Sequence, residues 1–384
     1  MLLVSCLLAA SCSQPPPAPI ELRELPLTAL PDIDGAAVLS HITALSSDAL
    51  EGRGPGTNGE ELAVRYIAEQ FQKAGLKPGN TDGTYIQKVP LVGVTGEVGP
   101  LVLKKGAAEL RLTPKDDFVA WTRRVVGGSS LKDSELVFVG YGVVAPEYNW
   151  DDYKGLDVKG KTLVMLVNDP PVPDPAKPAE LDPNVFGGKA MTYYGRWTYK
   201  FEIGAEKGAA GILLIHETER AGYGFDVVQS SWSGEQFGLA TPDKNMGRAS
   251  LEGWTTLDRG RQLLKMAGQD FDALKRQAAM REFKPVPLGV RASVAVRNTL
   301  RAVDSKNVVA KLEGADPKLK DEYVVYTAHW DHLGVGPAIG GDPIYNGAVD
   351  NGSGVGGMLE IARAYTKLAT PPKRSVVFLS VTAE

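Results

Sequence analysis

The sequence predicts an α/β protein in which one domain is interrupted by a second, β-rich domain. Apolar residues recur at helical spacing in residues 33–75, whereas residues 289–384 supply strands and a single helix. Neither part alone has a balanced set of helices and strands, so we expect residues 21–91 and 289–384 to form one domain. Between them, residues 92–288 contain short alternating strands separated by Gly, Pro and Asp, which predicts an inserted domain. With 384 residues and 43% hydrophobic content, the chain is long enough for two cores.

The charge balance argues against two classes of partner. The formal net charge is -4, and no long block of like charges interrupts the sequence. The chain therefore lacks the electrostatic footprint of a protein that binds nucleic acid or an anionic membrane surface. We expect no nucleic-acid partner, and the sequence favours no particular oligomeric state.

Residues 1–20 are predicted to be an export signal followed by a proline-rich linker. Both cysteines, Cys6 and Cys12, lie in an apolar run that is too short to span a bilayer as a mature helix. Small residues before Cys12 and prolines in residues 15–19 resemble a bacterial lipoprotein signal, although no Lys or Arg precedes the apolar run. We expect export to the periplasm or outer membrane as a lipoprotein, with a lipid on Cys12 as the only membrane anchor. An ordinary cleaved signal and secretion are the alternative.

Two amphipathic helices are predicted within residues 33–75, with a glycine-rich loop between them. Thr57 and Glu60 have the spacing of a capping box at the start of the second helix, which Gly75 terminates. A loop with a cap is the simpler interpretation of this segment. The functional alternative is that Arg53 and the neighbouring glycines border a substrate cleft.

The predicted insert combines strands with one helical segment. Residues 135–142 and 161–167 are predicted strands, and residues 199–207 have helical character. Small residues then precede a buried strand that ends at His216. This histidine has no potential partner nearby in sequence, so we interpret it as structural.

The last part of the chain predicts a βαβ unit. Residues 291–296 and 307–312 alternate like strands. Residues 323–328, which are mostly β-branched and aromatic, are predicted to form a buried strand. A helix over residues 353–368 leads to a second buried strand over residues 374–381. The two strands joined by this helix should be parallel, with their carboxyl ends at one rim of the sheet.

Polar residues gather at that rim. His329 and Asp331 follow the first strand, Asp350 stands just before the helix, and Glu384 follows the second strand. Neutral imidazole and carboxylate are ligands that zinc favours, so we predict a metal site. The alternatives are a polar turn at the strand end and a plain helix-capping loop, in which Ser353 caps the helix. The chain holds four histidines, at positions 41, 216, 329 and 332.

These residues resemble the co-catalytic zinc aminopeptidases of peptidase family M28. The similarity rests on the His-x-Asp strand end at 329–331, the Asp-Asn-Gly-Ser-Gly turn at 350–354 and the Thr-Ala-Glu strand end at 382–384. It extends to Leu-Glu-Gly-Arg-Gly at 50–54 and Ala-Gly-Leu-Lys-Pro at 74–78. The resemblance implies a three-layer αβα zinc-exopeptidase fold with a mixed, largely parallel sheet.

The insert resembles a protease-associated domain, most clearly at Lys-Gly-Ala-Ala-Gly-Ile in residues 207–212. Its position between two parts of one domain leads us to expect that it shapes or covers the substrate cleft. This part of the resemblance is carried by weaker motifs than the peptidase part.

The resemblance to the aminopeptidases also implies roles for individual residues. His329 would bind one of two zinc ions, Asp350 would bridge both, and Asp331 would hold His329 in its ligating orientation. Glu384 would be the general base in the hydrolysis of a peptide substrate. His332 has no role in this scheme, and Val349 stands where the family commonly has a second acid.

The printed sequence ends at Glu384, where the family would continue with a second glutamate that binds zinc. We therefore expect the chain to be a fragment with an incomplete sheet. One imidazole and one bridging carboxylate are fewer than the three protein ligands of a catalytic zinc site, so the fragment alone should bind zinc weakly and have little activity.

Other functions fit the same sequence. A glutaminyl cyclase is an alternative on the same fold, and carboxypeptidases have a similar architecture. A binding lipoprotein that has lost its metals is the non-enzymatic alternative. Retention of all four proposed site residues argues against that loss.

Overall fold

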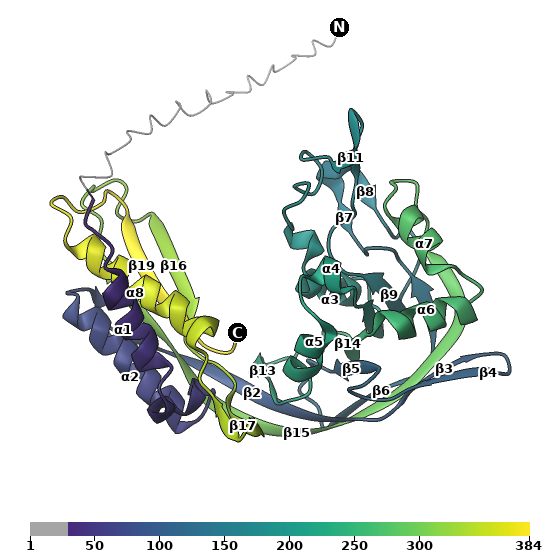
Figure 1. The fold of residues 1–384 in the computed structure, drawn as a ribbon, viewed down its shortest axis with the longest axis horizontal. Coiled ribbons are helices and arrows are strands. Elements are labelled where there is room, and N and C mark those ends of the chain that lie inside the picture. The colour runs from purple at the N-terminus through teal and green to yellow at the C-terminus, as the bar shows by residue number, and fades with distance from the viewer. Residues whose placement is uncertain (1–29) are drawn as a thin grey trace, which may run out of the picture.

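A computed structural model describes residues 30–384, which form two lobes joined by two long strands (Figure 1). The first lobe combines the beginning and the end of the chain, and we call it the terminal lobe. The second consists of the residues between them, and we call it the insert lobe. The predictions for residues 1–20, including the lipid on Cys12, lie outside the described residues. Within residues 30–384 no helix is long and apolar enough to cross a membrane.

The helices are α1 (Gly35–Leu45), α2 (Asn58–Lys73), α3 (Trp197–Glu206), α4 (Thr218–Ala221), α5 (Phe225–Ser231), α6 (Leu257–Met266), α7 (Phe271–Ala278) and α8 (Gly354–Thr366). Short helical turns are η2 (Asp48–Arg53), η3 (Pro146–Tyr148), η4 (Tyr193–Gly195) and η5 (Ala348–Ser353).

The strands of the largest sheet are β1 (Lys77–Pro78), β2 (Ile86–Val98), β3 (Leu101–Lys105), β4 (Ala108–Leu112), β5 (Phe118–Trp121), β6 (Gly128–Phe138), β9 (Thr162–Leu166), β12 (Gly211–Ile215), β13 (Gln236–Leu239), β14 (Leu251–Thr255), β15 (Val286–Leu312), β16 (Tyr323–His329) and β19 (Ser375–Val381). Three small sheets pair β7 (Val144–Ala145) with β8 (Trp150–Asp151), β10 (Pro173–Asp174) with β11 (Lys177–Leu181), and β17 (Gly334–Ile339) with β18 (Asp342–Tyr345).

The large sheet contains parallel and antiparallel pairs and passes through both lobes. β6, β9, β12 and β14 are parallel in the insert lobe, and β16 and β19 are parallel in the terminal lobe. β15 pairs antiparallel with β19 at one end and with β6 at the other. The predicted α/β class with a mixed sheet is confirmed, as is the parallel βαβ unit at the end of the chain. The expectation of a largely parallel sheet is wrong for residues 30–384, because β2 and β15 pair with their neighbours in antiparallel register.

The terminal lobe is held together by an aromatic cluster. The ring of Phe378 on β19 lies 6.1 Å from Phe71 of α2, 6.0 Å from Tyr365 of α8 and 5.5 Å from Tyr326 of β16, measured between ring centroids. Because one side chain contacts both helices, α2 and α8 cover the same face of the sheet. α1 packs in turn against α8 (Figure 1).

The insert lobe has a separate core. Its buried apolar side chains lie between Leu101 and Val296, whereas those of the terminal lobe lie between Leu45 and Leu76 and between Val308 and Phe378. Five helices, α3 to α7, accompany its strands. The predicted helix at 199–207 corresponds to α3, but α4 to α7 were not predicted, so the insert is less purely β-rich than its sequence indicated.

Two strand predictions need correction. The predicted strands at 291–296 and 307–312 belong to one continuous strand, β15. The strand at 323–328 is not buried, since Val325 is 54% exposed. Within the described residues β16 pairs only with β19, so it forms an edge of the sheet.

Both predicted helix caps are wrong. Thr57 makes no capping hydrogen bond, because its hydroxyl donates to the Gly54 carbonyl, and the buried Glu60 carboxylate accepts from Gly56 N at 2.5 Å. Ser353 donates back to the Val349 carbonyl instead of capping α8. The Asn351 side-chain oxygen accepts from Gly354 N at 3.0 Å in its place. Gly75 ends α2 in the left-handed conformation (φ 85°), as predicted.

Candidate functional site

Three segments meet at one rim of the terminal lobe. β16 ends at His329, which pairs in parallel register with Val381 of β19, so Glu384 emerges at the same end of the sheet. The turn η5, which contains Asp350, leads into α8 between these two strands. The topology that the sequence predicted therefore brings these segments to one place.

His329 and Asp350 face each other at this rim. The His329 Nε2 atom lies 3.1 Å from Asp350 Oδ1, and the Asp350 side chain is 64% exposed. His332, which had no predicted role, places its Nδ1 atom 3.6 Å from the other Asp350 oxygen. One exposed carboxylate thus lies between two imidazoles, one from the last residue of β16 and one from the segment that follows it.

Asp331 connects His329 with Glu384. His329 Nδ1 donates to the Asp331 backbone oxygen at 3.2 Å and lies 3.7 Å from Asp331 Oδ1. The second carboxylate oxygen, Oδ2, accepts from the backbone N–H of Glu384 at 3.3 Å. Asp331 is buried, and its Oδ1 atom has no hydrogen-bond partner among the described residues.

The two imidazoles differ in their affinity for a proton. Burial lowers the pKa of His329, but the Asp331, Glu384 and Asp350 carboxylates outweigh it and leave that pKa above its usual value. Burial dominates at His332 and lowers its pKa, although Asp350 opposes this. Both nitrogens of His329 face oxygen atoms, which agrees with the raised pKa.

Arg53 does not border an open cleft. Its side chain is only 1% exposed, and burial lowers its pKa despite the opposing carboxylates of Asp331 and Asp350. The guanidinium is surrounded by backbone carbonyl groups, including that of Trp330 at 2.7 Å. The alternative that placed Arg53 at a cleft is therefore wrong.

A second buried contact supports the strand end that carries Glu384. Glu60 Oε1 accepts from Ser305 Oγ at 3.0 Å, and the same hydroxyl lies 2.6 Å from Thr382 Oγ1. Thr382 N donates to Asn307 Oδ1 at 3.0 Å. Sequence analysis missed this connection because Glu60 and Ser305 are 245 residues apart.

The residues at the rim fit part of a zinc site. His329 offers Nε2 while its Nδ1 is held by Asp331, which is the arrangement that orients a metal-binding histidine. The unpartnered Asp331 Oδ1 is a further acceptor on that side of the ring. Within residues 30–384, however, no group of three or more His, Cys, Asp or Glu side chains is arranged to hold a metal ion. His329 and Asp350 are thus two ligands of an incomplete set.

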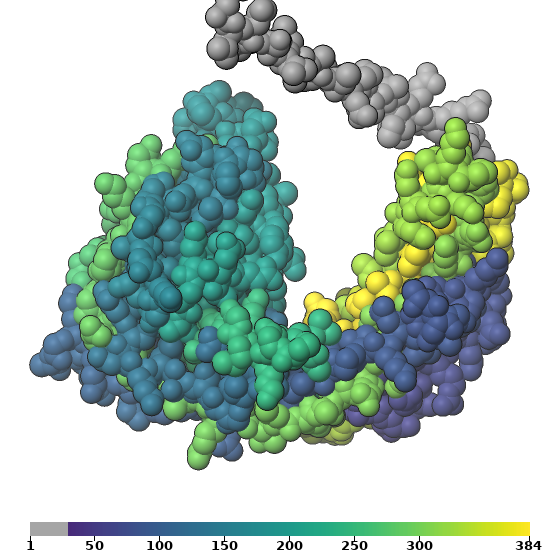
Figure 2. Space-filling view, turned by 180° about the vertical axis from the view of Figure 1, so that it is seen from behind, coloured from purple at the N-terminus to yellow at the C-terminus, as the bar shows by residue number. Residues whose placement is uncertain are grey.

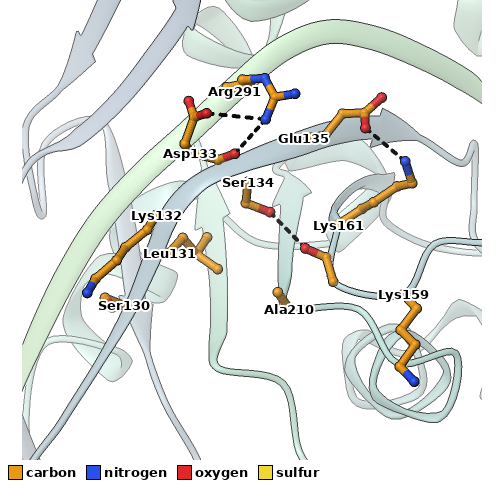
Figure 3. Close-up of a pocket in the computed structure, with 11 residues that line it drawn as sticks. Ser130, Leu131, Lys132, Asp133, Ser134, Glu135, Lys159, Lys161, Ala210 and Arg291 are labelled. Carbon is orange, nitrogen blue, oxygen red and sulfur yellow. Dashed lines mark hydrogen bonds and ion pairs between the residues drawn. The ribbon is translucent and has the colours of Figure 1, made fainter.

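Two pockets lie away from this rim, whereas the C-terminus at the rim faces the space between the lobes (Figure 1). The lobes flank a wide hollow in the surface (Figure 2). A pocket of about 330 Å³ in the insert lobe is lined by two ion pairs, Arg291 with Asp133 at 3.2 Å and Lys161 with Glu135 at 2.8 Å (Figure 3). A pocket of about 340 Å³ lies beside α2. Neither pocket includes the residues at the rim.

Solved structures and a sequence family resemble the chain. An aminopeptidase from Aneurinibacillus sp. strain AM-1 is 19% identical (TM-score 0.39) and matches over 91% of this chain and 62% of its own. A zinc aminopeptidase from Bacillus subtilis is 16% identical (TM-score 0.36), with 91% and 61% covered. A peptidase M28 precursor from Shewanella amazonensis is 15% identical (TM-score 0.38), with 90% and 63% covered. No curated protein matches by sequence.

The structural likenesses are too distant to carry an argument about the site, and the chain spans about three fifths of the length of these structures. The sequence model of peptidase family M28 matches residues 307–384, the segment that contains His329, Asp331, Asp350 and Glu384. The match to this family covers that segment of the chain and leaves residues 1–306 outside it.

Proposed function

We propose that the whole protein is a zinc-dependent exopeptidase, and specifically an aminopeptidase that hydrolyses N-terminal residues of peptides. The observation that carries this proposal is the 3.1 Å approach of His329 Nε2 to Asp350 Oδ1 at the rim of the sheet. It brings together an imidazole and a carboxylate, and both belong to the segment that matches the peptidase family.

In this proposal His329 and Asp350 would hold zinc. Bound zinc would polarise the scissile carbonyl and lower the pKa of the attacking water. Glu384, which is exposed at the rim, would accept the proton of that water and pass it to the leaving amine. Asp331 would fix the His329 ring through Nδ1 and position the backbone of Glu384 through Oδ2.

The test is zinc content and hydrolysis of amino-acid anilides by the whole protein, beside its Glu384→Gln variant. We expect bound zinc in both and a fall in kcat of about 10²- to 10⁴-fold in the variant, because the substituted amide cannot accept a proton. Glu69→Gln, at an exposed position on α2, is the matched control and should keep full activity.

The products separate the alternatives. Release of a free amino acid supports the aminopeptidase, whereas pyroglutamate formation from N-terminal glutamine would identify a glutaminyl cyclase. Metal-free, inactive protein would favour a binding lipoprotein. Full activity in Glu384→Gln would refute the assignment of the base.

A further inference from the structure

Arg53 has an unusual environment for a buried cation. Its Nε donates to the Trp330 carbonyl at 2.7 Å, Nη1 to Asn346 O at 2.7 Å, and Nη2 to Gly347 O at 2.9 Å. Nη1 also donates to the Leu45 carbonyl. The guanidinium therefore binds four backbone carbonyls, and within the described residues it forms no direct ion pair.

These carbonyls belong to the two segments that carry the candidate ligands. Trp330 lies between His329 and Asp331, and Gly347 lies three residues before Asp350. The backbone of Arg53 adds another link, since His332 N donates to its carbonyl at 3.3 Å. One side chain thus ties the end of β16 to the turn before α8.

The planar shape of the side chain explains why arginine occupies this position. A guanidinium has five N–H donors in a fixed fork, whereas a lysine ammonium is a compact charge on a flexible stem. Lysine at this position would reach only some of the carbonyls and would leave the others buried without a donor. The charge itself is offset by the nearby carboxylates of Asp331 and Asp350.

We propose that Arg53 is a positioning residue that sets the separation between His329 and Asp350. By holding the Trp330 and Gly347 carbonyls on one rigid fork, it fixes the two segments so that the His329 ring faces the Asp350 carboxylate. Arg53 would not touch substrate or metal. This positioning role rests on the proposed function, in which His329 and Asp350 hold zinc. The positions of the two segments can nevertheless be tested without measuring activity.

The test compares Arg53→Lys with Arg363→Lys. Arg363 is a matched control because its guanidinium donates to the buried Glu360 carboxylate through Nε at 2.6 Å and lies on the same lobe. It stands near the far end of α8, nine residues after Gly354 and so about 14 Å along the helix from the end that follows Asp350. Both variants replace a planar guanidinium by an ammonium, but only Arg53 contacts the two segments at the rim.

The first readout is the ¹⁵N spectrum of the imidazoles in the metal-free chain of 384 residues, which contains four histidines. We expect Arg53→Lys to shift the His329 and His332 signals while the His41 and His216 signals stay in place. Arg363→Lys should leave His329 and His332 unchanged. The second readout is the zinc affinity of the whole protein. We expect this affinity to fall about 10- to 100-fold in Arg53→Lys, the usual effect of removing a residue that positions a metal ligand.

The outcomes are distinct. Unchanged His329 and His332 signals in Arg53→Lys would overturn the proposal. Simultaneous collapse of all four histidine signals would assign Arg53 a purely structural role and would also overturn it. If the whole wild-type protein binds no zinc, the proposed function fails, whereas a selective shift of His329 and His332 would still support the positioning role.

Discussion

Gly347 lies at the candidate site, where its neighbours leave no room for a side chain. It has φ 60°, and a Cβ atom added to it would lie 2.4 Å from the Asp350 carbonyl oxygen and 2.6 Å from Arg53 Nη2. Gly347→Ala should therefore lower the free energy of unfolding by about 1–3 kcal/mol, since alanine is strained in this conformation. Urea unfolding measures the difference.

Gly357 provides the opposite case within the same region. It lies inside α8, where an added Cβ would meet nothing within 4 Å. Gly357→Ala should raise the free energy of unfolding by about 0.5–1 kcal/mol, because alanine loses less backbone entropy in a helix. Equal stability of the two alanine variants would refute the account of Gly347.

His216 makes stability depend on pH. It is 2% exposed among aromatic rings at the end of β12, and this burial lowers its pKa. The folded chain therefore binds a proton less readily than the unfolded chain. The contribution of His216 to stability is complete above the unfolded pKa of about 6.5 and is lost as pH falls through the lower folded pKa.

His216→Phe tests this dependence, since phenylalanine keeps an aromatic ring but does not titrate. Between pH 7 and pH 5 the free energy of unfolding should fall more steeply for the wild type than for the variant. The other three histidines are common to both chains, so the difference between the two curves isolates His216. Parallel curves would contradict the prediction.

The candidate site shows which residues can be inferred from sequence. His329 and Asp350 were brought together by βαβ topology alone, because parallel strands put their carboxyl ends at one rim. The roles of Thr57 and Ser353 were inferred from local spacing and are wrong, because the two hydroxyls donate to the nearby backbone carbonyls of Gly54 and Val349 instead. The contacts of Arg53 depend on a left-handed backbone (φ 54°) and on carbonyls hundreds of residues away, which spacing does not reveal.

At the level of elements, the buried strands were the most predictable and the connecting ones the least. β12 is a short apolar run buried along its whole length, and β19 is a short apolar run covered by helices on one face, so their sequences identify them. β15 is one strand, but Thr299 to Ala302 is exposed on both faces where it passes between the lobes. Because no core covers that stretch, apolar and polar residues do not alternate there. The sequence therefore predicted two separate strands where the structure has one.

The hairpin β17–β18 was missed for a related reason. Its two strands pair only with each other within the described residues, and Val335 and Ile339 are exposed. A strand without a covered face has no period-two pattern, so only the glycines of its turn remain as a signal. The hairpin nevertheless places Asn346 and Gly347 against Arg53, which is why its position matters for the site.

At the level of the whole molecule, the two lobes have separate cores but share the ladder between β2 and β15. Ile86 to Val98 pairs with Val296 to Val308 in uninterrupted antiparallel register, and the last pair joins Val98 to Val296. Contacts in the terminal lobe therefore do not require the apolar residues of the insert lobe. The predicted boundaries at residues 92 and 288 fall inside these two strands.

This geometry predicts that the insert lobe can be removed. Replacing residues 99–295 by Asn-Gly would close Val98 and Val296 into a two-residue hairpin, the connection that such a pair favours. The shortened chain should unfold cooperatively and keep the wild-type ¹⁵N signals of His329 and His332, because the terminal lobe retains its own core.

In the whole protein the same deletion should change the ratio of kcat/KM values between peptide substrates, since the insert borders the hollow between the lobes (Figure 2). Unchanged ratios in an active, folded deletion protein would show that the insert has no part in substrate selection, and loss of cooperative unfolding would show that the lobes depend on each other.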